Sequence, residues 1–190
     1  SLEKKRLRDS EDNYLDRVET DKKRSQQILK TVMPTSVANE LQSSGKVRSR
    51  RYDDVAIFIC DLVGFTSFCE KNNPELVVET LQGLVEKFEK AFEDFGLEKI
   101  KTVGDAIVAV AGLSSHTSSP IKSCVDCAHE IREIANSASM PWDLHLGIHS
   151  GSLVAGTIGT KTVQFDILGQ TVNVAFNICD MSEANQILIS

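Results

Sequence analysis

Positive charge is in short supply in this sequence. Its 190 residues include 21 lysines and arginines but 27 aspartates and glutamates, which gives a formal net charge of −6. Proteins that bind nucleic acid present basic surfaces, so this balance gives no reason to expect nucleic acid as a partner. An anionic ligand would have to be held locally, by a metal ion, by backbone N–H groups or by a few placed cations.

Paired cysteines and long apolar runs are also missing. The five cysteines are odd in number and lie mostly among apolar residues, so we expect reduced thiols and a cytoplasmic protein rather than a disulfide framework. There is neither a signal peptide nor a run of about 18 apolar residues, so we expect that this chain does not itself span a membrane. A longer protein that contains it can still carry an upstream sensor or membrane domain and hold this part on the cytoplasmic side.

The first 45 residues differ in composition from the rest, because they are rich in charged residues and glutamine and contain no glycine before Gly45. Their apolar residues recur at two heptad positions: Leu7, Tyr14 and Ile28 at one, Val18 and Val32 at the other. This spacing predicts a helix over residues 2–32 that can pair with a copy of itself, although a solvated helix with incidental apolar residues explains the pattern equally well.

Pro34 is expected to end that helix, with a short helix through Leu41 and a linker at residues 43–45. We therefore divide the chain into a helical, coiled-coil-like connector over residues 1–45 and a single domain over residues 46–190.

Strand and helix patterns alternate from Tyr52 onward. The long helix near residues 73–95 has Asn73 as N-cap, Pro74 at its first position and Gly96 as its stop. Further helices are expected near residues 119–138 and 171–181, and strands at residues 54–61, 97–103, 106–112, 142–151 and 186–190. Helices packed on a mainly antiparallel sheet predict an α+β sandwich of ferredoxin-like, palm type.

Two aspartates lie where strands of this sheet end. Asp61 follows the apolar run "VAIFIC", and Asp105 lies in the turn "VGDA" between two strands, so a split βαβ arrangement can make them neighbours. Two close carboxylates repel unless they are protonated or bridged by cations, and Mg²⁺ is commonly held by one or two carboxylates plus substrate phosphates. Residues 62–66, "LVGFT", can present backbone N–H groups to a polyphosphate at the start of a short helix.

Four segments carry a resemblance to a known family. They read "VAIFICDLVGFTSF", "KIKTVGDAIVAV", "LHLGIHSGSLVAGTIG" and "FDILGQTVNVA". In this order and at these intervals they resemble the signature segments of the class III nucleotidyl cyclase catalytic domain, over roughly residues 46–190. The preceding helix and "ILKTVMPTSVANEL" resemble the signalling-helix connector that often precedes such domains.

The resemblance implies a palm-type fold, a head-to-tail homodimer with active sites at the interface, and conversion of ATP or GTP to a 3′,5′-cyclic nucleotide and pyrophosphate. It implies two Mg²⁺ or Mn²⁺ ions, held by Asp61, Asp105 and the carbonyl of Leu62. The loop that follows would bind the phosphates through Val63, Gly64, Phe65 and Thr66.

The positions that select the base in this family correspond to Lys101 and Asp166. Lysine can donate to N1 of adenine, and aspartate can accept from the exocyclic amine. Guanine presents a carbonyl and an N–H there, and the family usually meets it with glutamate at the first position. The pair therefore favours ATP over GTP and implies an adenylate cyclase.

The last family motif departs from its pattern. An asparagine and an arginine normally lie one helical turn apart and face the ribose and the α-phosphate. Here the segment "NVAFN" supplies Asn173 and puts Asn177 in place of the arginine. Asparagine carries no charge, so we expect reduced activity. The sequence also stops before the terminal strands that usually carry a phosphate-contacting lysine, so those strands are expected to be absent.

Two hypotheses follow. The first is a homodimeric adenylate cyclase in intracellular signalling, with metals held by one protomer and with Lys101, Asp166 and Asn173 supplied by the other. The alternative is a catalytically weak or inactive cyclase-like regulatory module that binds nucleotide and dimerises. A diguanylate cyclase is less consistent with the sequence because no "GG[DE]EF" segment occurs.

Three further features are interpreted as structural. Cys124 and Cys127 form a C-x-x-C within a predicted helix, without the second pair that a zinc site needs. His145 and His149 share one face of a strand and are expected to make local hydrogen bonds. Residues 150–159, "SGSLVAGTIG", lack the order of a dinucleotide or P-loop site and predict tight hairpin geometry.

Overall fold

The computed structural model describes residues 2–114 and 118–190, with side chains from Tyr14 onward. The chain forms two compact units, which meet in sequence between Val47 and Arg48. This division lies two residues beyond the boundary expected from composition. None of the helices in the described residues is long and apolar enough to cross a membrane.

The first unit consists of α1 (Leu2–Val32) and α2 (Thr35–Ser44). The helix over residues 2–32 and its end before Pro34 match the prediction. The expected linker at residues 43–45 was wrong, because α2 continues to Ser44 and only Gly45 leaves the helix, at φ 69°. The hydroxyls of Ser43 and Ser44 donate to the carbonyl of Glu40, which satisfies them within the helix.

The apolar heptad residues of α1 whose side chains are described all face solvent: Tyr14, Val18, Ile28 and Val32. Pairing of this helix with a second copy would bury them, and it remains a prediction.

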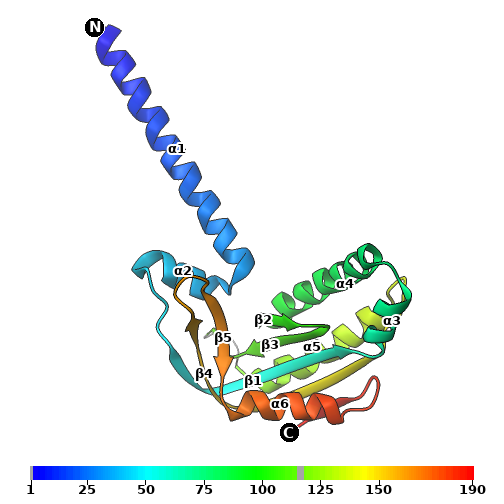
Figure 1. The fold of residues 1–190 in the computed structure, drawn as a ribbon. Coiled ribbons are helices and arrows are strands. Elements are labelled where there is room, and N and C mark those ends of the chain that lie inside the picture. The colour runs from blue at the N-terminus through cyan, green and yellow to red at the C-terminus, as the bar shows by residue number, and fades with distance from the viewer. Residues whose placement is uncertain (1, 115–117) are drawn as a thin grey trace. The chain divides into compact units, whose positions relative to one another are not determined.

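The second unit is built on a six-stranded sheet (Figure 1). Its strands are β1 (Arg50–Leu62), β2 (Leu97–Val103), β3 (Ala106–Ala111), β4 (Leu144–Ile158), β5 (Gln164–Leu168) and β6 (Ile187–Ile189). The order is β2-β3-β1-β4-β5 with every pair antiparallel, and β6 pairs with β4 in parallel. The predicted α+β fold with a mainly antiparallel sheet is confirmed.

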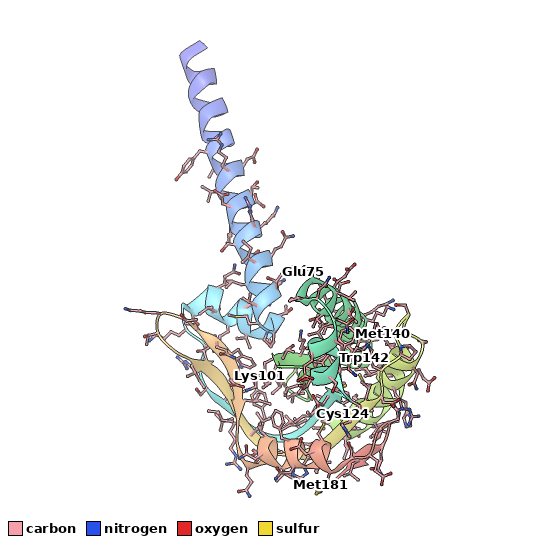
Figure 2. The ribbon with its side chains drawn as sticks, turned by 45° about the vertical axis from the view of Figure 1, so that its right-hand side comes forward. Glu75, Lys101, Cys124, Met140, Trp142 and Met181 are labelled. Carbon is pink, nitrogen blue, oxygen red and sulfur yellow. The ribbon has the colours of Figure 1, made fainter. Side chains whose placement is uncertain are left out.

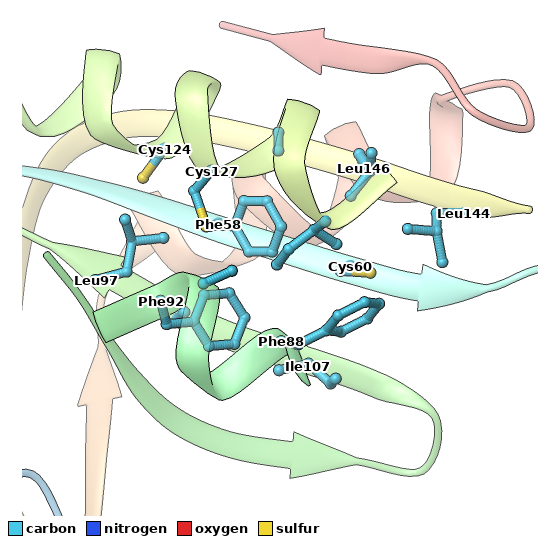
Figure 3. Packing of buried hydrophobic residues seen from close by; sticks show 14 of the residues in the cluster. Phe58, Cys60, Phe88, Phe92, Leu97, Ile107, Cys124, Cys127, Leu144 and Leu146 are labelled. Carbon is cyan, nitrogen blue, oxygen red and sulfur yellow. The ribbon is translucent and has the colours of Figure 1, made fainter. Parts of the chain in front are cut away.

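The helices of this unit are α3 (Phe65–Lys71), α4 (Pro74–Phe95), α5 (Pro120–Asn136) and α6 (Gln170–Met181). Helices α4 and α5 cover one face of the sheet, and α6 packs against β4 and β1 (Figure 1). The main core lies under α4 and α5, where Phe58 of β1 meets Phe92 of α4 edge-on with ring centroids 5.6 Å apart (Figure 3).

Alternation along β1 decides which side chains reach the core and which reach the opposite face. Cys60 and Leu62 belong to the core under α4 and α5, as do Leu144 and Leu146 of β4. Successive side chains of a strand point to opposite faces, so Asp61 and His145 lie on the face that α6 covers. Gly147 on that face lets α6 approach closely, since a Cβ there would lie 2.5 Å from the backbone nitrogen of Cys179.

The N-terminal cap of α4 gives a first testable prediction. Asn73 Oδ1 accepts a 2.8 Å hydrogen bond from the Leu76 N–H. Replacing Asn73 with alanine should lower the free energy of unfolding by about 1 kcal/mol, measured by urea denaturation, because this helix N–H loses its acceptor. Asn73→Ser is the control, since it keeps an acceptor, and an equal loss in both variants would contradict the capping role.

Candidate active site

The two aspartates meet because the strands that end at them are neighbours. β1 pairs with β3 from Ala56 to Cys60, so Asp61 lies one residue beyond this pairing, beside the β2–β3 turn that carries Asp105. Both side chains are half-buried. Together they form a pair of carboxylates at the edge of the sheet.

The environment of Asp61 disfavours its charge. Burial raises the pKa of the Asp61 carboxyl above its usual value of 3.8, and the nearby Asp105 carboxylate raises it further. The His145 side chain acts in the opposite direction, while Asp180 of α6 also raises this pKa. A cation bound between the two carboxylates would offset both effects.

This electrostatic conflict predicts a stability effect that depends on pH. A carboxyl whose pKa is raised in the folded state binds protons more tightly there, so the free energy of unfolding falls as the pH rises above 3.8 through the raised value. Metal-free Asp61→Asn should therefore melt at a higher temperature than the wild type at pH 7, and this difference should shrink near pH 4. Melting curves at the two pH values measure it, and a lower melting temperature of Asp61→Asn at pH 7 would contradict it.

The carboxylate pair suits a hard divalent cation. Among the residues whose side chains are described, no group of three or more His, Cys, Asp or Glu side chains could hold a metal ion. Two protein carboxylates fit Mg²⁺ or Mn²⁺, which take oxygen ligands and complete their shells with water and substrate phosphates. Asp61 and Asp105 would hold such ions together with the Leu62 carbonyl.

The loop after β1 turns at Gly64 and begins α3. Gly64 has φ 76°, a backbone conformation that a glycine adopts without strain. The first N–H groups of a helix lack intrahelical acceptors, so Phe65 and Thr66 can direct theirs towards an anion. Val63 was also expected to bind the phosphates, but its N–H already donates to the Asp143 carbonyl at 3.0 Å. Its amide therefore anchors the loop to the segment before β4.

Aromatic packing fixes α3 beside the carboxylates. The rings of Phe65 and Phe68 lie 5.9 and 5.0 Å from the buried Trp142, which is labelled in Figure 2. Two half-buried phenylalanines of a seven-residue helix thus hold it to the start of β4. The loop at Gly64 is positioned from both of its ends.

Lys101 and Asp166 form an ion pair. Lys101 Nζ lies 2.8 and 2.9 Å from the two carboxylate oxygens of Asp166, and the side chains are 24% and 18% exposed. Lys101 belongs to β2 and Asp166 to β5, the two ends of the strand order (Figures 1 and 2). The sheet is therefore curled so that its edge strands meet at this pair, and Asp166 is held further by the Ile167 N–H at 2.8 Å.

Asn173 and Asn177 are both exposed on α6. They are one turn apart, and the opposite face of the helix, including Ala175 and Ile178, packs against the sheet. Their side chains therefore point away from the sheet that carries Asp61 and Asp105. The structure brings together the two aspartates, and separately Lys101 and Asp166, but it directs the two asparagines outward.

Two of the three features interpreted as structural match that interpretation, and the third does not. Cys124 and Cys127 are buried in α5, and burial raises the pKa of the Cys124 thiol to about 12. His145 Nδ1 lies 2.7 Å from the Ser182 carbonyl, and His149 Nδ1 lies 2.9 Å from the Ser190 carbonyl. Residues 150–159 do not form a tight hairpin, because β4 continues straight through them to Ile158 and the turn to β5 follows.

The sequence pattern missed one neighbour of the carboxylates. His145 lies directly opposite Asp61 in the pairing of β1 with β4. The even spacing of His145 and His149 predicts that they share one face of a strand. Which residue lies opposite each of them depends on the register between β1 and β4, and neither segment alone encodes that register.

Comparison with known proteins gives the same assignment. Residues 47–190 match the family model described as the adenylate and guanylate cyclase catalytic domain. The soluble guanylate cyclase gcy-31 of Caenorhabditis elegans is 32% identical over 184 residues, which cover 93% of this chain and 26% of that protein. The human guanylate cyclase soluble subunit alpha-2 is 29% identical over 177 residues, covering 91% of this chain and 24% of that protein. The chain thus spans about a quarter of the length of these two relatives.

Solved structures show the same fold. The catalytic core of a rhodopsin-guanylyl cyclase with converted specificity, in complex with ATPαS, has a TM-score of 0.72 at 26% identity and covers 75% of this chain and 80% of that one. The adenylyl cyclase CyaB of Pseudomonas aeruginosa has a TM-score of 0.68 at 24% identity over 75% and 79% of the two chains, a likeness of fold alone. The chain belongs to the adenylate and guanylate cyclase catalytic domain family, and its residues 47–190 form a nucleotidyl cyclase catalytic domain.

Proposed function

We propose that the protein converts ATP to 3′,5′-cyclic AMP and pyrophosphate. The observation that carries the choice of base is the ion pair of Lys101 and Asp166, with Nζ 2.8 Å from Oδ1. Lysine presents N–H donors and aspartate presents acceptors, which is the complement of adenine N1 and its exocyclic amine. Guanine would set its N1–H against the lysine and its carbonyl against the carboxylate, so both contacts would be unfavourable.

The relatives do not decide the base. The two curated relatives named above are guanylate cyclases, and the structural neighbours include one bound to ATPαS and another bound to GTP. The argument for ATP therefore rests on the two side chains of this chain. GTP is the less favoured substrate.

The two carboxylates and the loop after β1 would bind the metal ions and the phosphates. Asp61 and Asp105 would hold two Mg²⁺ or Mn²⁺ ions, which when bound lower the pKa of the ribose 3′-hydroxyl and neutralise the triphosphate. The N–H groups at the start of α3 would bind phosphate oxygens. Asn173 would bind the ribose, and Asn177 would donate to the α-phosphate without supplying charge.

The outward direction of Asn173 and Asn177 supports a head-to-tail homodimer. In such a dimer each active site combines the carboxylates of one protomer with α6 and the base-selecting pair of the other. The guanylyl cyclase domain of the RhoGC fusion protein of Blastocladiella emersonii, a structural neighbour, is described as a non-canonical dimer in one structure and as a monomer in another, so the proposal rests on the two asparagines of this chain. The N-terminal helices would then control activity by setting the geometry of the two protomers.

Product formation tests the proposal. Purified protein at several concentrations is incubated with ATP or GTP and with Mg²⁺ or Mn²⁺, and the nucleotides are separated chromatographically beside Asp61→Ala. Cyclic AMP from ATP, with a rate that rises faster than linearly with protein and is lost in Asp61→Ala, is the expected result. A folded protein that binds ATP and metal but forms no cyclic product from either nucleotide would instead be a regulatory module, for which Asn177 is the motivating residue.

A further inference from the structure

The peptide unit between Leu62 and Val63 is held in one orientation by the segment before β4. Its N–H, which belongs to Val63, donates to the Asp143 carbonyl at 3.0 Å. The N–H and the carbonyl of a trans peptide lie in one plane and point in opposite directions, so the Leu62 carbonyl points away from β4. The neighbour of β1 on that side is β3, which directly follows the turn that carries Asp105. The hydrogen bond to Asp143 thus directs the Leu62 oxygen towards the side of the second carboxylate.

Asn185 holds the segment that supplies this bond. Its backbone N–H donates to the Leu144 carbonyl at 2.7 Å, and its Oδ1 accepts from the Leu144 N–H at 3.1 Å. Its Nδ2 donates to Asp143 Oδ1 at 2.6 Å. These bonds continue the parallel pairing of β6 with β4 beyond Leu146 and Ile187, in the direction of the carboxylates. Residues 143 and 144 are therefore held by β1 on one side and by Asn185 on the other.

The backbone conformation of Asn185 suits this residue type. Among the described residues it is the one non-glycine with a positive φ, at 62°. Asparagine enters the left-handed region more readily than most residues, because its short polar side chain can hydrogen-bond locally. Arg132 of α5 donates a further bond, of 3.3 Å, to the Asn185 carbonyl. A glycine would keep this backbone conformation but lose the bonds of the side chain, so the two contributions can be separated by substitution.

We propose that Asn185 is a positioning residue for the metal site. Acting through Asp143, it fixes the direction in which the Leu62 carbonyl can bind a divalent ion. Partners that orient metal ligands typically contribute about 10- to 100-fold to metal affinity or activity. This inference rests on the proposed metal-dependent function and concerns a residue to which the family resemblance assigns no role. The structural alternative is that Asn185 ties the C-terminal segment to β4 and contributes to stability alone.

The experiment compares Asn185→Gly with His149→Ala, in which β4 loses a different tie to the C-terminal segment. His149 Nδ1 lies 2.9 Å from the Ser190 carbonyl. His149 is paired with Ile57, well before Leu62 on β1, so this tie lies away from the metal site. The two variants therefore weaken the same pairing at its two ends.

Three measurements separate metal binding from stability. Free Mn²⁺ is measured by electron paramagnetic resonance with 3′-deoxy-ATP or 3′-deoxy-GTP, which lack the attacking hydroxyl, and the Mn²⁺ bound by nucleotide alone is subtracted. Trp142 is the single tryptophan of the chain and directly precedes Asp143, so quenching of its fluorescence by acrylamide reports the local order of this segment. The melting temperature reports the stability of the whole protein.

We expect Asn185→Gly to bind Mn²⁺ about tenfold more weakly than His149→Ala, while the two melt within a few degrees of each other. Acrylamide should quench Trp142 more strongly in Asn185→Gly than in His149→Ala. Equal Mn²⁺ affinity in the two variants would overturn the inference, even if the wild type makes a cyclic nucleotide. A wild type that binds Mn²⁺ but forms no cyclic product would refute the proposed activity alone, and one that binds no Mn²⁺ would refute both.

Exchanging donor and acceptor provides a second test. Asn185→Asp sets two carboxylates together at the 2.6 Å contact with Asp143, so it should weaken Mn²⁺ binding at least as much as Asn185→Gly. Adding Asp143→Asn restores a hydrogen bond with its direction reversed, and the new carboxylate can still accept from the Leu144 N–H, so most of the Mn²⁺ affinity should return. The double variant keeps the net charge and decides the question even if Asn185→Gly does not fold. A double variant that melts normally but binds Mn²⁺ as weakly as Asn185→Asp would contradict the inference.

Discussion

Replacing Asn177 with arginine should raise the rate of cyclic AMP formation about 100-fold or more. A charged donor that faces the transferring phosphorus stabilises the negative charge of the transition state, and arginines in comparable positions contribute about 10³-fold or more to phosphoryl transfer. Asn177 is exposed on α6, one turn from Asn173, so an arginine there can reach outward without being buried in its own protomer. The measured quantity is kcat at saturating ATP.

Asn177→Gln is the matched control for this prediction, because it lengthens the side chain without adding charge. The glutamine variant should stay within a few-fold of the wild type, so that the gain can be assigned to charge rather than to reach. An arginine variant no faster than the glutamine variant would show that Asn177 does not face the phosphates. The homodimer orientation proposed for α6 would then have to be abandoned.

Exchanging Lys101 and Asp166, the pair proposed to select the base, should change the preferred nucleotide. In Lys101→Glu with Asp166→Cys, the new carboxylate can accept from N1–H of guanine, and the thiol can donate weakly to its carbonyl. Sites built to hydrogen-bond one substrate reject a mismatched one by about 10⁴-fold or more. We therefore expect the ratio of kcat/KM for ATP to kcat/KM for GTP to fall by about 10³-fold or more in the double variant.

The single variants are informative controls because the wild-type side chains bind each other. Lys101→Glu alone sets a carboxylate against Asp166 at the contact between β2 and β5, so it should lose activity with both nucleotides and melt at a lower temperature. The double variant removes this repulsion and should recover thermal stability. An equal loss of ATP and GTP turnover in the double variant, with normal melting, would mean that the pair only joins the sheet edges.

Local signals predicted the elements around the site well. Asn73, Pro74 and Gly96 predicted both ends of α4. An N-cap, a proline at the first helical position and a glycine in the left-handed conformation are each recognised from the residue type and its position alone. The meeting of Asp61 and Asp105 was also predictable, since each follows a strand and the strand order of this topology is restricted. These inferences needed only residues close together in the chain and one assumption about topology.

Features that depend on pairing across the sheet could not be predicted in the same way. β4 runs through the glycines of residues 150–159, which suggested a hairpin, because Gly151 and Gly156 make room for Thr171 and Ser49 rather than for a turn. β5 was read as part of a motif and not as a strand. The Val63 amide was expected to face phosphate, but it meets the Asp143 carbonyl, which lies far away in sequence.

β1 gives the site a mechanical property. This single strand of 13 residues starts shortly after the first unit ends and carries Asp61 as its last residue but one. From Ala56 to Cys60 it is paired on both sides and fully buried, so we expect this stretch to be stiff. Its pairing with β4 is irregular between Tyr52 and Val55, and such an irregularity bends a strand locally. We therefore expect a displacement of the residues before Val55 to be partly absorbed at this irregularity before it reaches Asp61.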